Sequence, residues 1–476
     1  MDNCKTKQLT TLTFVGMTCA LVASVRNIPN VASTGWSMLF YMSIAVLFYA
    51  LPITLISGEF AGMFPQNGGP EVWVSNALGL KWGFVVSWLL WVQMFPGMVM
   101  VASSLAPLLG NSINNISLGL NNKFTLCVIL VVYWLITLLN LKFDMAKIGG
   151  KIGIWLGLYI PLSMMLILGI ATWIRVGFLP HGTLGPFSIE KLLPNKSSFV
   201  YFAPIMFIFS GIEMSSVYIT RLKKPVKTYT LGIFIALVFL FLMNTLNALV
   251  VANVVPKEQM ELNNVAQPIL IYCQILGLPH IFVNLFSLLV FVGVVVQLSA
   301  WASGPSKTIT ESARKGAYPP KFKFWKTNKF GVSKSVLLTQ STVISIFSLF
   351  YLLIPEVNLA FLMLVNATTV IYCIVYIIMG IALLKFRKEH PEYQRPFRIG
   401  KKGSKSDLGA WTTVLILIGS IVFSVGLTMK SSTLISFIVV LIVSIILFCI
   451  PIVINKIKKP SWNQVVKNKI DKKTNN

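Results

Sequence analysis

Residues 199–220 read Phe-Val-Tyr-Phe-Ala-Pro-Ile-Met-Phe-Ile-Phe-Ser-Gly-Ile-Glu-Met-Ser-Ser-Val-Tyr-Ile-Thr, a stretch long and apolar enough to cross a bilayer. It nevertheless contains Pro204, Gly211 and Glu213. Gly and Pro interrupt helices, and the freed backbone groups need partners that lipid does not supply. A carboxylate at this depth is costly unless it faces protein or water. An interrupted transmembrane helix with an acid beside the break is typical of a transport site; the alternative is a packing glycine with a carboxylate at the membrane edge.

The composition is that of a polytopic helical membrane protein. Of the 476 residues, 55% are hydrophobic and only 11% are charged, whereas soluble domains carry roughly 25% charged residues. The formal net charge of +26 could indicate a nucleic-acid partner. Its Lys and Arg residues, however, lie in loops between apolar runs, where a membrane orientation signal explains them better. We therefore expect one membrane domain in contact with the lipid bilayer, and no nucleic acid.

Twelve apolar runs approach the length of a spanning helix. They are residues 10–32, 37–60, 82–109, 124–141, 152–174, 199–220, 230–254, 281–304, 335–354, 358–384, 410–429 and 432–455. With the N-terminus in the cytoplasm, 33 of the 40 Lys and Arg residues fall in cytoplasmic segments and six outside. This positive-inside bias predicts that both termini are cytoplasmic. Between the spans, 61–81 and 263–278 each read as a loop with a short interfacial helix.

A second interruption is predicted in the first span. Residues 21–29 contain Arg26, and Pro29 removes a backbone donor and disfavours helix at the preceding residue. The break is expected near residues 22–24. Breaks in spans 1 and 6, five spans apart, are the spacing of two five-helix repeats with inverted topology.

These breaks predict the following division of the chain. A cytoplasmic N-terminus (1–9) precedes the first repeat (10–197, spans 1–5), the second repeat (198–408, spans 6–10), spans 11–12 (409–455) and a basic cytoplasmic tail (456–476). The six cysteines are scattered singly, without metal-ligand spacing, and we expect no metal and no cofactor.

Three motifs resemble one family over essentially all twelve spans. They are Gly-Gly-x-x-x-Trp-Val-Ser-Asn-x-Leu-Gly at 68–79, Ser-Gly-Ile-Glu at 210–213 and Ser-Ala-Trp-Ala-Ser-Gly-Pro-Ser-Lys at 299–307. They resemble the amino acid–polyamine–organocation superfamily and, within it, the bacterial glutamate/γ-aminobutyrate antiporters. The resemblance implies a fold of the LeuT type, with a 5+5 inverted repeat plus two helices and with spans 1 and 6 discontinuous. It also implies exchange of an external amino acid for an internal amine-bearing product.

The chain departs from that family at three places. Where the family has Val-Tyr-Glu-Tyr-Pro in span 1, this sequence has Val-Arg-Asn-Ile-Pro at 25–29, so that Arg26 and Asn27 replace a tyrosine and an acid. Where the family has Glu in span 8, the sequence has Gln297. The family's long, His-containing tail is replaced by a short Lys/Asn-rich tail without His.

The predicted site combines groups that suit an amino acid. Backbone N–H groups after the span 1 break favour a carboxylate, and free carbonyls around Gly211 favour an ammonium group. Arg26 can bind a side-chain carboxylate bidentately, or instead pair internally with Glu213 or extend to the outer interface. Glu213 is the candidate for proton coupling, because burial favours the neutral form of a carboxyl. The full set of predicted substrate-binding residues is Ala23, Ser24, Arg26, Asn27, Phe207, Phe209, Ser210, Gly211, Gln297 and Trp301.

The sequence thus predicts a secondary amino acid transporter of the bacterial cytoplasmic (inner) membrane. Exchange of a glutamate-like amino acid for an internal amino acid or amine such as γ-aminobutyrate is favoured, and a proton-coupled importer of a neutral or acidic amino acid is the alternative. A channel is disfavoured because no filter repeat or charged ring is visible. An enzyme is disfavoured because no catalytic His/Asp/Glu or Ser/His cluster accompanies the spans. The substrate, sodium dependence and a possible homodimer stay open.

Overall fold

The computed structural model describes residues 9–65, 69–143, 145, 155–328, 330–354, 356–400 and 407–466. Over these ranges the chain is helical, and its one β interaction is an isolated bridge between Leu9 and Leu222. Eleven helices or runs of joined helices within them are long and apolar enough to cross a membrane. The predicted all-α polytopic fold is therefore confirmed. The twelve-span count, the inverted repeat and its domain boundaries remain predictions.

The elements up to residue 176 follow the predicted spans closely. They are α1 (Thr11–Val22), η1 (Val25–Asn27), α2 (Ile28–Ala32), η2 (Gly35–Ser37), α3 (Met38–Ile44), η3 (Ala45–Ala50), α4 (Leu51–Met63), α5 (Pro70–Leu78), α6 (Leu80–Val92), α7 (Met94–Ser103), α8 (Leu105–Ser112), η4 (Ile116–Leu120), α9 (Asn122–Lys142), η6 (Trp155–Tyr159) and α11 (Ile160–Val176).

The remaining elements include the longest helices. They are η7 (Ile189–Leu192), η8 (Lys196–Tyr201), α12 (Phe202–Phe207), η9 (Ile212–Arg221), α13 (Pro225–Val254), η10 (Lys257–Gln259), α14 (Gln267–Leu276), α15 (Ile281–Arg314), η11 (Pro320–Phe322), α16 (Lys334–Ser348), α17 (Phe350–Leu353), α18 (Val357–Glu389), α19 (Leu408–Ser431) and α20 (Leu434–Ile457). The short helices predicted within 61–81 and 263–278 correspond to α5 and α14.

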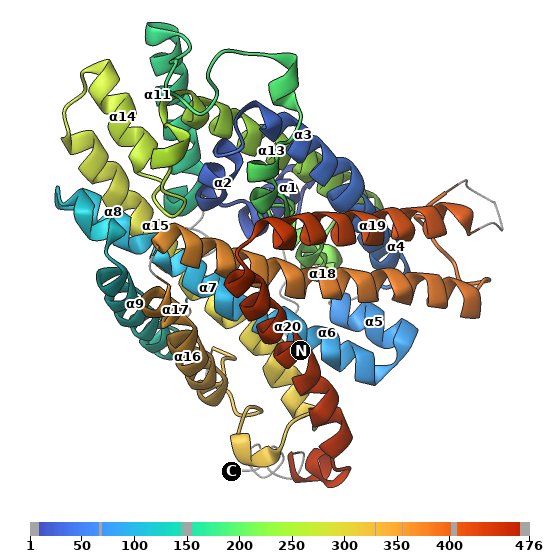
Figure 1. Ribbon diagram of the computed structural model, residues 1–476. Helices are drawn as coiled ribbons and strands as arrows, with labels where there is room; N and C mark the ends of the chain where they lie inside the picture. The colour runs from blue at the N-terminus through green and yellow to red at the C-terminus, as the bar shows by residue number, and fades with distance from the viewer. Residues whose placement is uncertain are drawn as a thin grey trace.

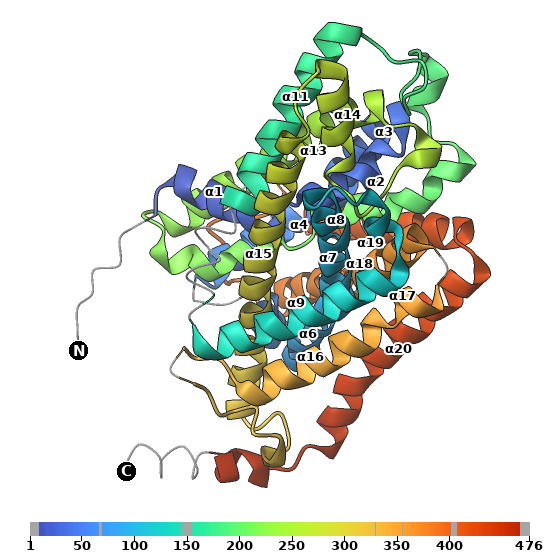
Figure 2. The ribbon, with the colours of Figure 1, turned by 90° about the vertical axis from the view of Figure 1, so that its left-hand side faces the viewer.

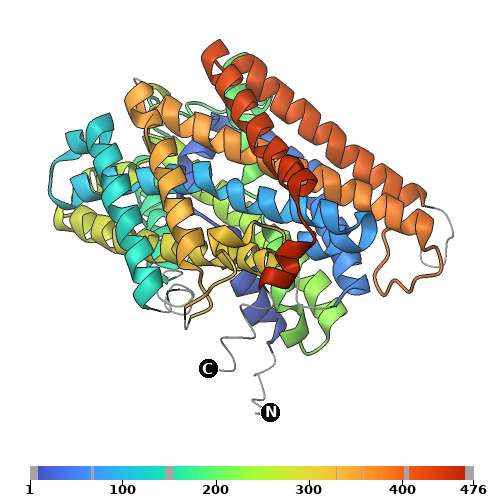
Figure 3. The ribbon, with the colours of Figure 1, turned by 90° about the horizontal axis from the view of Figure 1, so that it is seen from below.

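The residues at the two breaks are mostly buried, and the last two spans lie at the edge of the molecule. Figure 1 shows α1 and α2 near the centre, with α9 and α16 at one flank. In Figure 2, α15 runs through nearly the whole height of the protein. The red helices α19 and α20 form one edge when the molecule is seen from below (Figure 3). This arrangement surrounds the two interruptions with protein, which supplies the partners that lipid lacks.

The first span is interrupted where the sequence predicts. Helix α1 ends at Val22, Ala23 and Ser24 are extended, and a 3-10 turn leads into α2. Pro29 occupies the first turn of α2, where its missing N–H costs no helical hydrogen bond. The two halves, 12 and 5 residues long, are each too short to cross a bilayer.

The sixth span is interrupted at Gly211, although Pro204 does not contribute to the break. Pro204 lies in the first turn of α12, a position that tolerates proline. Helix α12 ends at Phe207, and Gly211 has φ 92°, in the left-handed region that glycine adopts without strain. The chain then continues as the 3-10 helix η9, which carries Glu213 in its first turn.

The two interruptions lie at the same depth. Helix α1 packs against η9, and α2 packs against α12, so the first half of each broken span pairs with the second half of the other. At one end of the pair, the Leu9 N–H donates to the Arg221 carbonyl at 2.8 Å. The pairing places both breaks at one level of the protein.

Helix α5 carries a carboxyl outside the membrane spans whose pKa is perturbed. Burial raises the pKa of Glu71, and the N–H groups of Glu71 and Gly69 and the charge of Lys315 oppose this shift. When the pKa of an acid is raised by folding, the protein loses stability as the pH rises from the ordinary pKa of the acid, here 4.5, through its pKa in the folded state.

We therefore expect Glu71→Gln to raise the melting temperature of the detergent-solubilised protein at neutral pH and to have little effect at about pH 4. Thermal unfolding followed across pH in both proteins measures this difference. A wild-type melting temperature that exceeds that of the variant by an amount growing with pH would contradict the expectation.

Candidate functional site

The predicted substrate-binding residues gather around the two breaks and on α15. Ala23, Ser24, Arg26 and Asn27 lie at the first break, and all four are buried. At the second break Phe209 and Ser210 are buried, whereas Phe207 and Gly211 are half-buried. Helix α15 contributes buried Gln297 and half-buried Trp301. The substrate-binding role of these residues remains a prediction.

Glu213 is held by a tyrosine of the tenth predicted span. It is fully buried, and the Tyr376 hydroxyl donates to its Oε2 at 2.7 Å. The same Tyr376 oxygen accepts the Gly211 N–H at 2.8 Å, so one hydroxyl joins the break to the acid. Among the described residues, the Glu213 Oε1 atom has no hydrogen-bond partner. The carboxyl is therefore half satisfied, and its second oxygen is available to a proton or to a donor of a ligand.

A second tyrosine supports the break from η3. The Tyr49 hydroxyl and the Ser210 Oγ are 2.7 Å apart, and the Tyr49 ring meets the Tyr376 ring edge to face at 5.7 Å. Tyr372, one turn before Tyr376, lies 6.3 Å from Phe207 between ring centroids. A Cβ added at Gly211 would come within 3.2 Å of the Tyr372 hydroxyl. The second break is thus enclosed on one side by aromatic side chains.

Arg26 lies apart from Glu213 and faces α15. Its side chain is buried, its Nη1 is 3.5 Å from the Gln297 Oε1, and its guanidinium carbon is 5.6 Å from the Trp301 ring centroid. Its Nε and Nη2 atoms, and the Gln297 amide nitrogen, have no partner in the described part of the chain. Neither the internal pair with Glu213 nor extension of Arg26 to the outer interface is formed in this structure.

Three tyrosines of the site were absent from the sequence prediction. Tyr372 and Tyr376 are spaced i, i+4 on α18, a signal that places them on one helix face but that aromatic packing also produces. Tyr49 lies 161 residues from its partner Ser210, and no local pattern links the two. Phe209, which belongs to the predicted substrate-binding set, is fully buried and packs in the core.

The unpartnered atoms carry opposite charge. A guanidinium with two free donor nitrogens lies at one break, and a carboxyl with a free oxygen lies beside the other. Buried polar groups in folded proteins usually have hydrogen-bond partners, so such atoms suit contact with a ligand or with water. An amino acid, which has a carboxylate and an ammonium group, offers complementary partners to both.

Comparison with known proteins agrees with this architecture. The model of the amino acid permease family matches residues 9–447. An uncharacterized transporter of Legionella pneumophila is 28% identical, over 83% of this chain and 84% of its own length. A glutamate/γ-aminobutyrate antiporter of Lactococcus lactis is 25% identical, over 84% and 80%, and a probable agmatine/putrescine antiporter of the same species is 24% identical, over 89% of each chain.

The family match covers nearly every helix of the fold, including both interrupted spans and the α15 and α18 segments that face them. The chain therefore belongs to the amino acid permease family, within the amino acid–polyamine–organocation superfamily.

Proposed function

We propose that this protein is a secondary transporter that exchanges an external, glutamate-like amino acid for an internal amino acid or amine such as γ-aminobutyrate. Transport proceeds by alternating access, with the substrate held between the breaks of spans 1 and 6. The observation that carries this proposal is the buried guanidinium of Arg26 beside the first break, because two of its nitrogens have no hydrogen-bond partner among the described residues. A buried cation whose donors are incompletely satisfied is costly, and a carboxylate of the substrate would satisfy them.

The relatives support exchange but differ in the substrates that their names give. One is named for glutamate and γ-aminobutyrate and another for agmatine and putrescine. A diamine carries no carboxylate, and its positive charges would be repelled by Arg26. The substrates proposed here are accordingly amino acids, and preferably those with a second carboxylate.

Proton-coupled import of a neutral or acidic amino acid is the second candidate. It is favoured by Glu213, a fully buried carboxyl with one unpartnered oxygen next to the break. We place the protein in the cytoplasmic membrane with both termini inside, on the basis of the Lys and Arg distribution.

Counterflow into proteoliposomes tests the proposal. Vesicles loaded with unlabelled glutamate, γ-aminobutyrate, leucine or putrescine receive external labelled glutamate, and uptake is followed with and without a pH gradient. Exchange predicts uptake only into vesicles loaded with an accepted amino acid. Uptake into empty vesicles driven by the pH gradient would support the importer instead. In a parallel assay with other labelled substrates outside, uptake of labelled putrescine but of no labelled amino acid would refute both.

Glu213→Gln is expected to flatten the pH dependence of transport between about pH 5 and 8 while changing substrate binding by less than roughly tenfold. Glutamine keeps an oxygen that accepts from Tyr376 but cannot titrate, and a neutral hydrogen bond contributes only about 0.5–1.5 kcal/mol. Rates and binding constants measured across pH in both proteins decide the matter. A variant that retains the wild-type pH profile would exclude Glu213 as the coupling group.

A further inference from the structure

Helix α15 holds Gln297 and Trp301 toward the first break. The two residues are spaced i, i+4, which places them on one face of the helix. Ser299 lies on the opposite face, where its carbonyl and its hydroxyl accept hydrogen bonds from the Asn140 amide of α9 at 3.0 and 2.8 Å. These bonds restrain the rotation of α15 about its own axis. Gln297 and Trp301 are therefore kept in contact with Arg26.

Arg26 determines how the Gln297 amide is oriented. A guanidinium has only donors, so only the amide oxygen can bond to it, and the Gln297 Oε1 lies 3.5 Å from the Arg26 Nη1. The Gln297 Nε2 then points elsewhere, and in the described part of the chain neither it nor the Arg26 Nε and Nη2 atoms have a hydrogen-bond partner. Only 5% of Gln297 and 3% of Arg26 are exposed. The two adjoining side chains thus carry three buried donor atoms without partners and no acceptor left over.

The charge of Arg26 is also uncompensated within the described ranges. None of the ion pairs formed by these residues includes Arg26. Its guanidinium carbon lies 5.6 Å from the Trp301 ring centroid, a contact that stabilises a cation but supplies no negative charge. A group that completes the set must therefore accept hydrogen bonds at more than one atom, donate none and carry a negative charge. A carboxylate meets all three conditions, whereas the amide of glutamine accepts at one atom and donates at the other.

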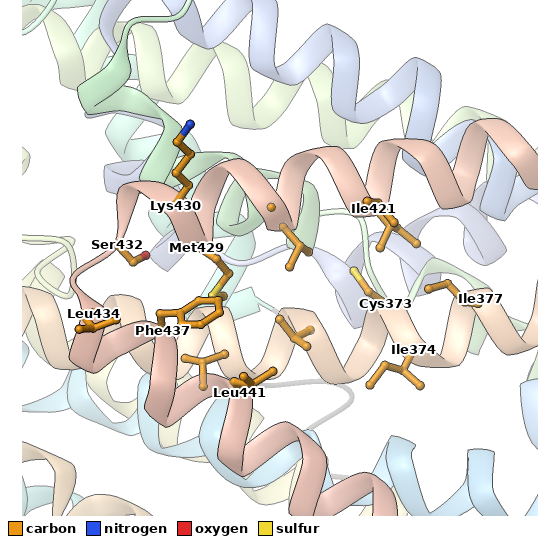
Figure 4. Close-up of a pocket in the computed structure, with 15 residues that line it drawn as sticks. Cys373, Ile374, Ile377, Ile421, Met429, Lys430, Ser432, Leu434, Phe437 and Leu441 are labelled. Carbon is orange, nitrogen blue, oxygen red and sulfur yellow. The ribbon is translucent and has the colours of Figure 1, made fainter.

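The groove between α18, α19 and α20 offers no comparable set of donors. It has a volume of ≈ 820 Å³ and is lined mainly by aliphatic and aromatic side chains. Lys430 is the charged residue among those that line it, and Figure 4 shows its side chain pointing away from the groove. An acidic ligand is therefore better matched by Arg26 and Gln297 than by this groove.

We propose that Arg26 and Gln297 form one subsite for a terminal carboxylate, and that this subsite reads the carboxylate that glutamate and γ-aminobutyrate have in common. This inference rests on the proposed function and names its recognition element. γ-Aminobutyrate is glutamate without the α-carboxylate, so the same carbon chain separates the amine from the terminal carboxylate in both. The subsite then serves both directions of the exchange, while the backbone N–H groups after the first break are needed only by glutamate. Glutamine is rejected because the N–H groups of its amide would meet donors.

Gln297→Glu reverses the chemistry of the subsite while keeping its shape. The new carboxylate would pair with Arg26, repel a carboxylate of the ligand and accept a hydrogen bond from a ligand amide. One hydrogen bond to a charged group changes an affinity by roughly 10- to 100-fold. The ratio of the glutamate affinity to the glutamine affinity should therefore fall roughly 100-fold, and glutamine should become the preferred ligand. Misfolding would lower both affinities and would not reverse their order.

Gln297→Met and Gln340→Glu complete the set of variants. Methionine keeps the length of the side chain but donates no hydrogen bond, so the affinities for glutamate and γ-aminobutyrate should fall by a similar factor, roughly 10- to 100-fold. Gln340 is also a buried glutamine, but its amide is bonded to Trp91, Tyr133 and Ser306. Gln340→Glu should lower the melting temperature and leave the preference for glutamate over glutamine unchanged.

Isothermal titration calorimetry on the purified, detergent-solubilised full-length protein measures these affinities. The ligands are glutamate, glutamine, γ-aminobutyrate and its amide, 4-aminobutanamide. In the wild type each acid should bind at least roughly tenfold more tightly than its amide. Equal binding of acid and amide, or a Gln297→Glu variant that still prefers glutamate, would overturn the subsite.

The shared carboxylate has a test of its own in the same titrations. If Gln297→Met weakens the binding of glutamate but not that of γ-aminobutyrate, the subsite reads glutamate alone, and the claim that it serves both substrates is wrong. Binding in detergent requires no exchange. A protein that shows the expected selectivity but fails in counterflow would retain the subsite and refute the proposed exchange, whereas counterflow with unaltered selectivity in Gln297→Glu would do the reverse.

Discussion

Arg26→Ala is expected to lower the affinity for glutamate and aspartate by roughly 30- to 1000-fold, or about 2–4 kcal/mol. The affinity for leucine and glutamine should fall much less. The structure sharpens the reason for this selectivity. Within the described part of the chain, two guanidinium nitrogens of Arg26 are buried without a hydrogen-bond partner, and its hydrogen bond to Gln297 is long at 3.5 Å. A carboxylate could therefore form two charge-assisted hydrogen bonds without displacing a strong internal partner.

The internal alternative predicts a different pattern. If Arg26 served mainly to neutralise Glu213, its removal would leave a buried carboxylate unpaired, and the affinity for every substrate would fall by a similar factor. In the structure, Glu213 is bonded to Tyr376 and Arg26 faces Trp301. We therefore expect Arg26→Ala to leave the melting temperature nearly unchanged, because the variant also removes an incompletely satisfied buried cation.

Arg26→Lys is the control for this experiment. A lysine keeps the positive charge but lacks the planar fork, so it should recover only part of the glutamate affinity. Competition by glutamate, aspartate, glutamine and leucine is measured in the wild type and both variants. An equal loss across all four substrates would reject a role for Arg26 in reading the side chain.

The interruptions of the fold could be predicted from sequence because their causes are local. Gly211 adopts a left-handed φ at the second break, and the first break falls at residues 23–24, ahead of Pro29. Pro29 and Pro204 both lie in the first turn of a helix, a position that tolerates proline. The chain is extended ahead of α2 but is already helical, as η8, ahead of α12, so Pro204 does not mark a break.

The partners of the charged residues could not be predicted, because they come from distant segments. Tyr376 reaches Glu213 across 163 positions, and Gln297 lies 271 positions from Arg26. A lone arginine and a lone glutamate in an apolar sequence favoured an internal pair as much as a substrate contact. Which of the two occurs depends on side-chain directions that are fixed only when the broken spans pack against α15 and α18.

The partners of Glu59 also come from distant segments and could not be predicted from the sequence. Substitution of Glu59 has the largest expected effect on stability. Glu59 lies near the end of the predicted second span, and no local sequence pattern indicates its partner. In the structure it is fully buried and ion-paired with Arg387 at the end of α18, whose Nε donates to its Oε1 at 2.8 Å. Arg395 lies 3.5 Å from Glu59, and the Ile399 N–H donates to its Oε2 at 2.8 Å. Asp407, at the start of α19, also pairs with Arg387 at 3.1 Å.

Glu59→Gln is expected to destabilise the protein by about 3–5 kcal/mol, the usual cost of leaving a buried charge without its partner. The variant would leave two buried arginines with Asp407 as their remaining acid among the described residues. Thermal unfolding of the detergent-solubilised protein measures this loss. Replacing Glu59 and Arg387 together by Gln and Met should cost less than Glu59→Gln alone, because the double variant removes one of the two cations that lose their partner.

The ion pair between Lys385 and Glu389 provides the control on the same helix. It spans 3.6 Å, and both side chains are nearly half exposed. Glu389→Gln should change the stability by less than about 1 kcal/mol, because solvent screens exposed pairs. If Glu59→Gln were no more costly than Glu389→Gln, the buried cluster would not hold α4 to the end of α18. In that case the ends of α4 and α18 would be free to move relative to each other, and the hydrophobic contacts of α4 would have to hold span 2 in place alone.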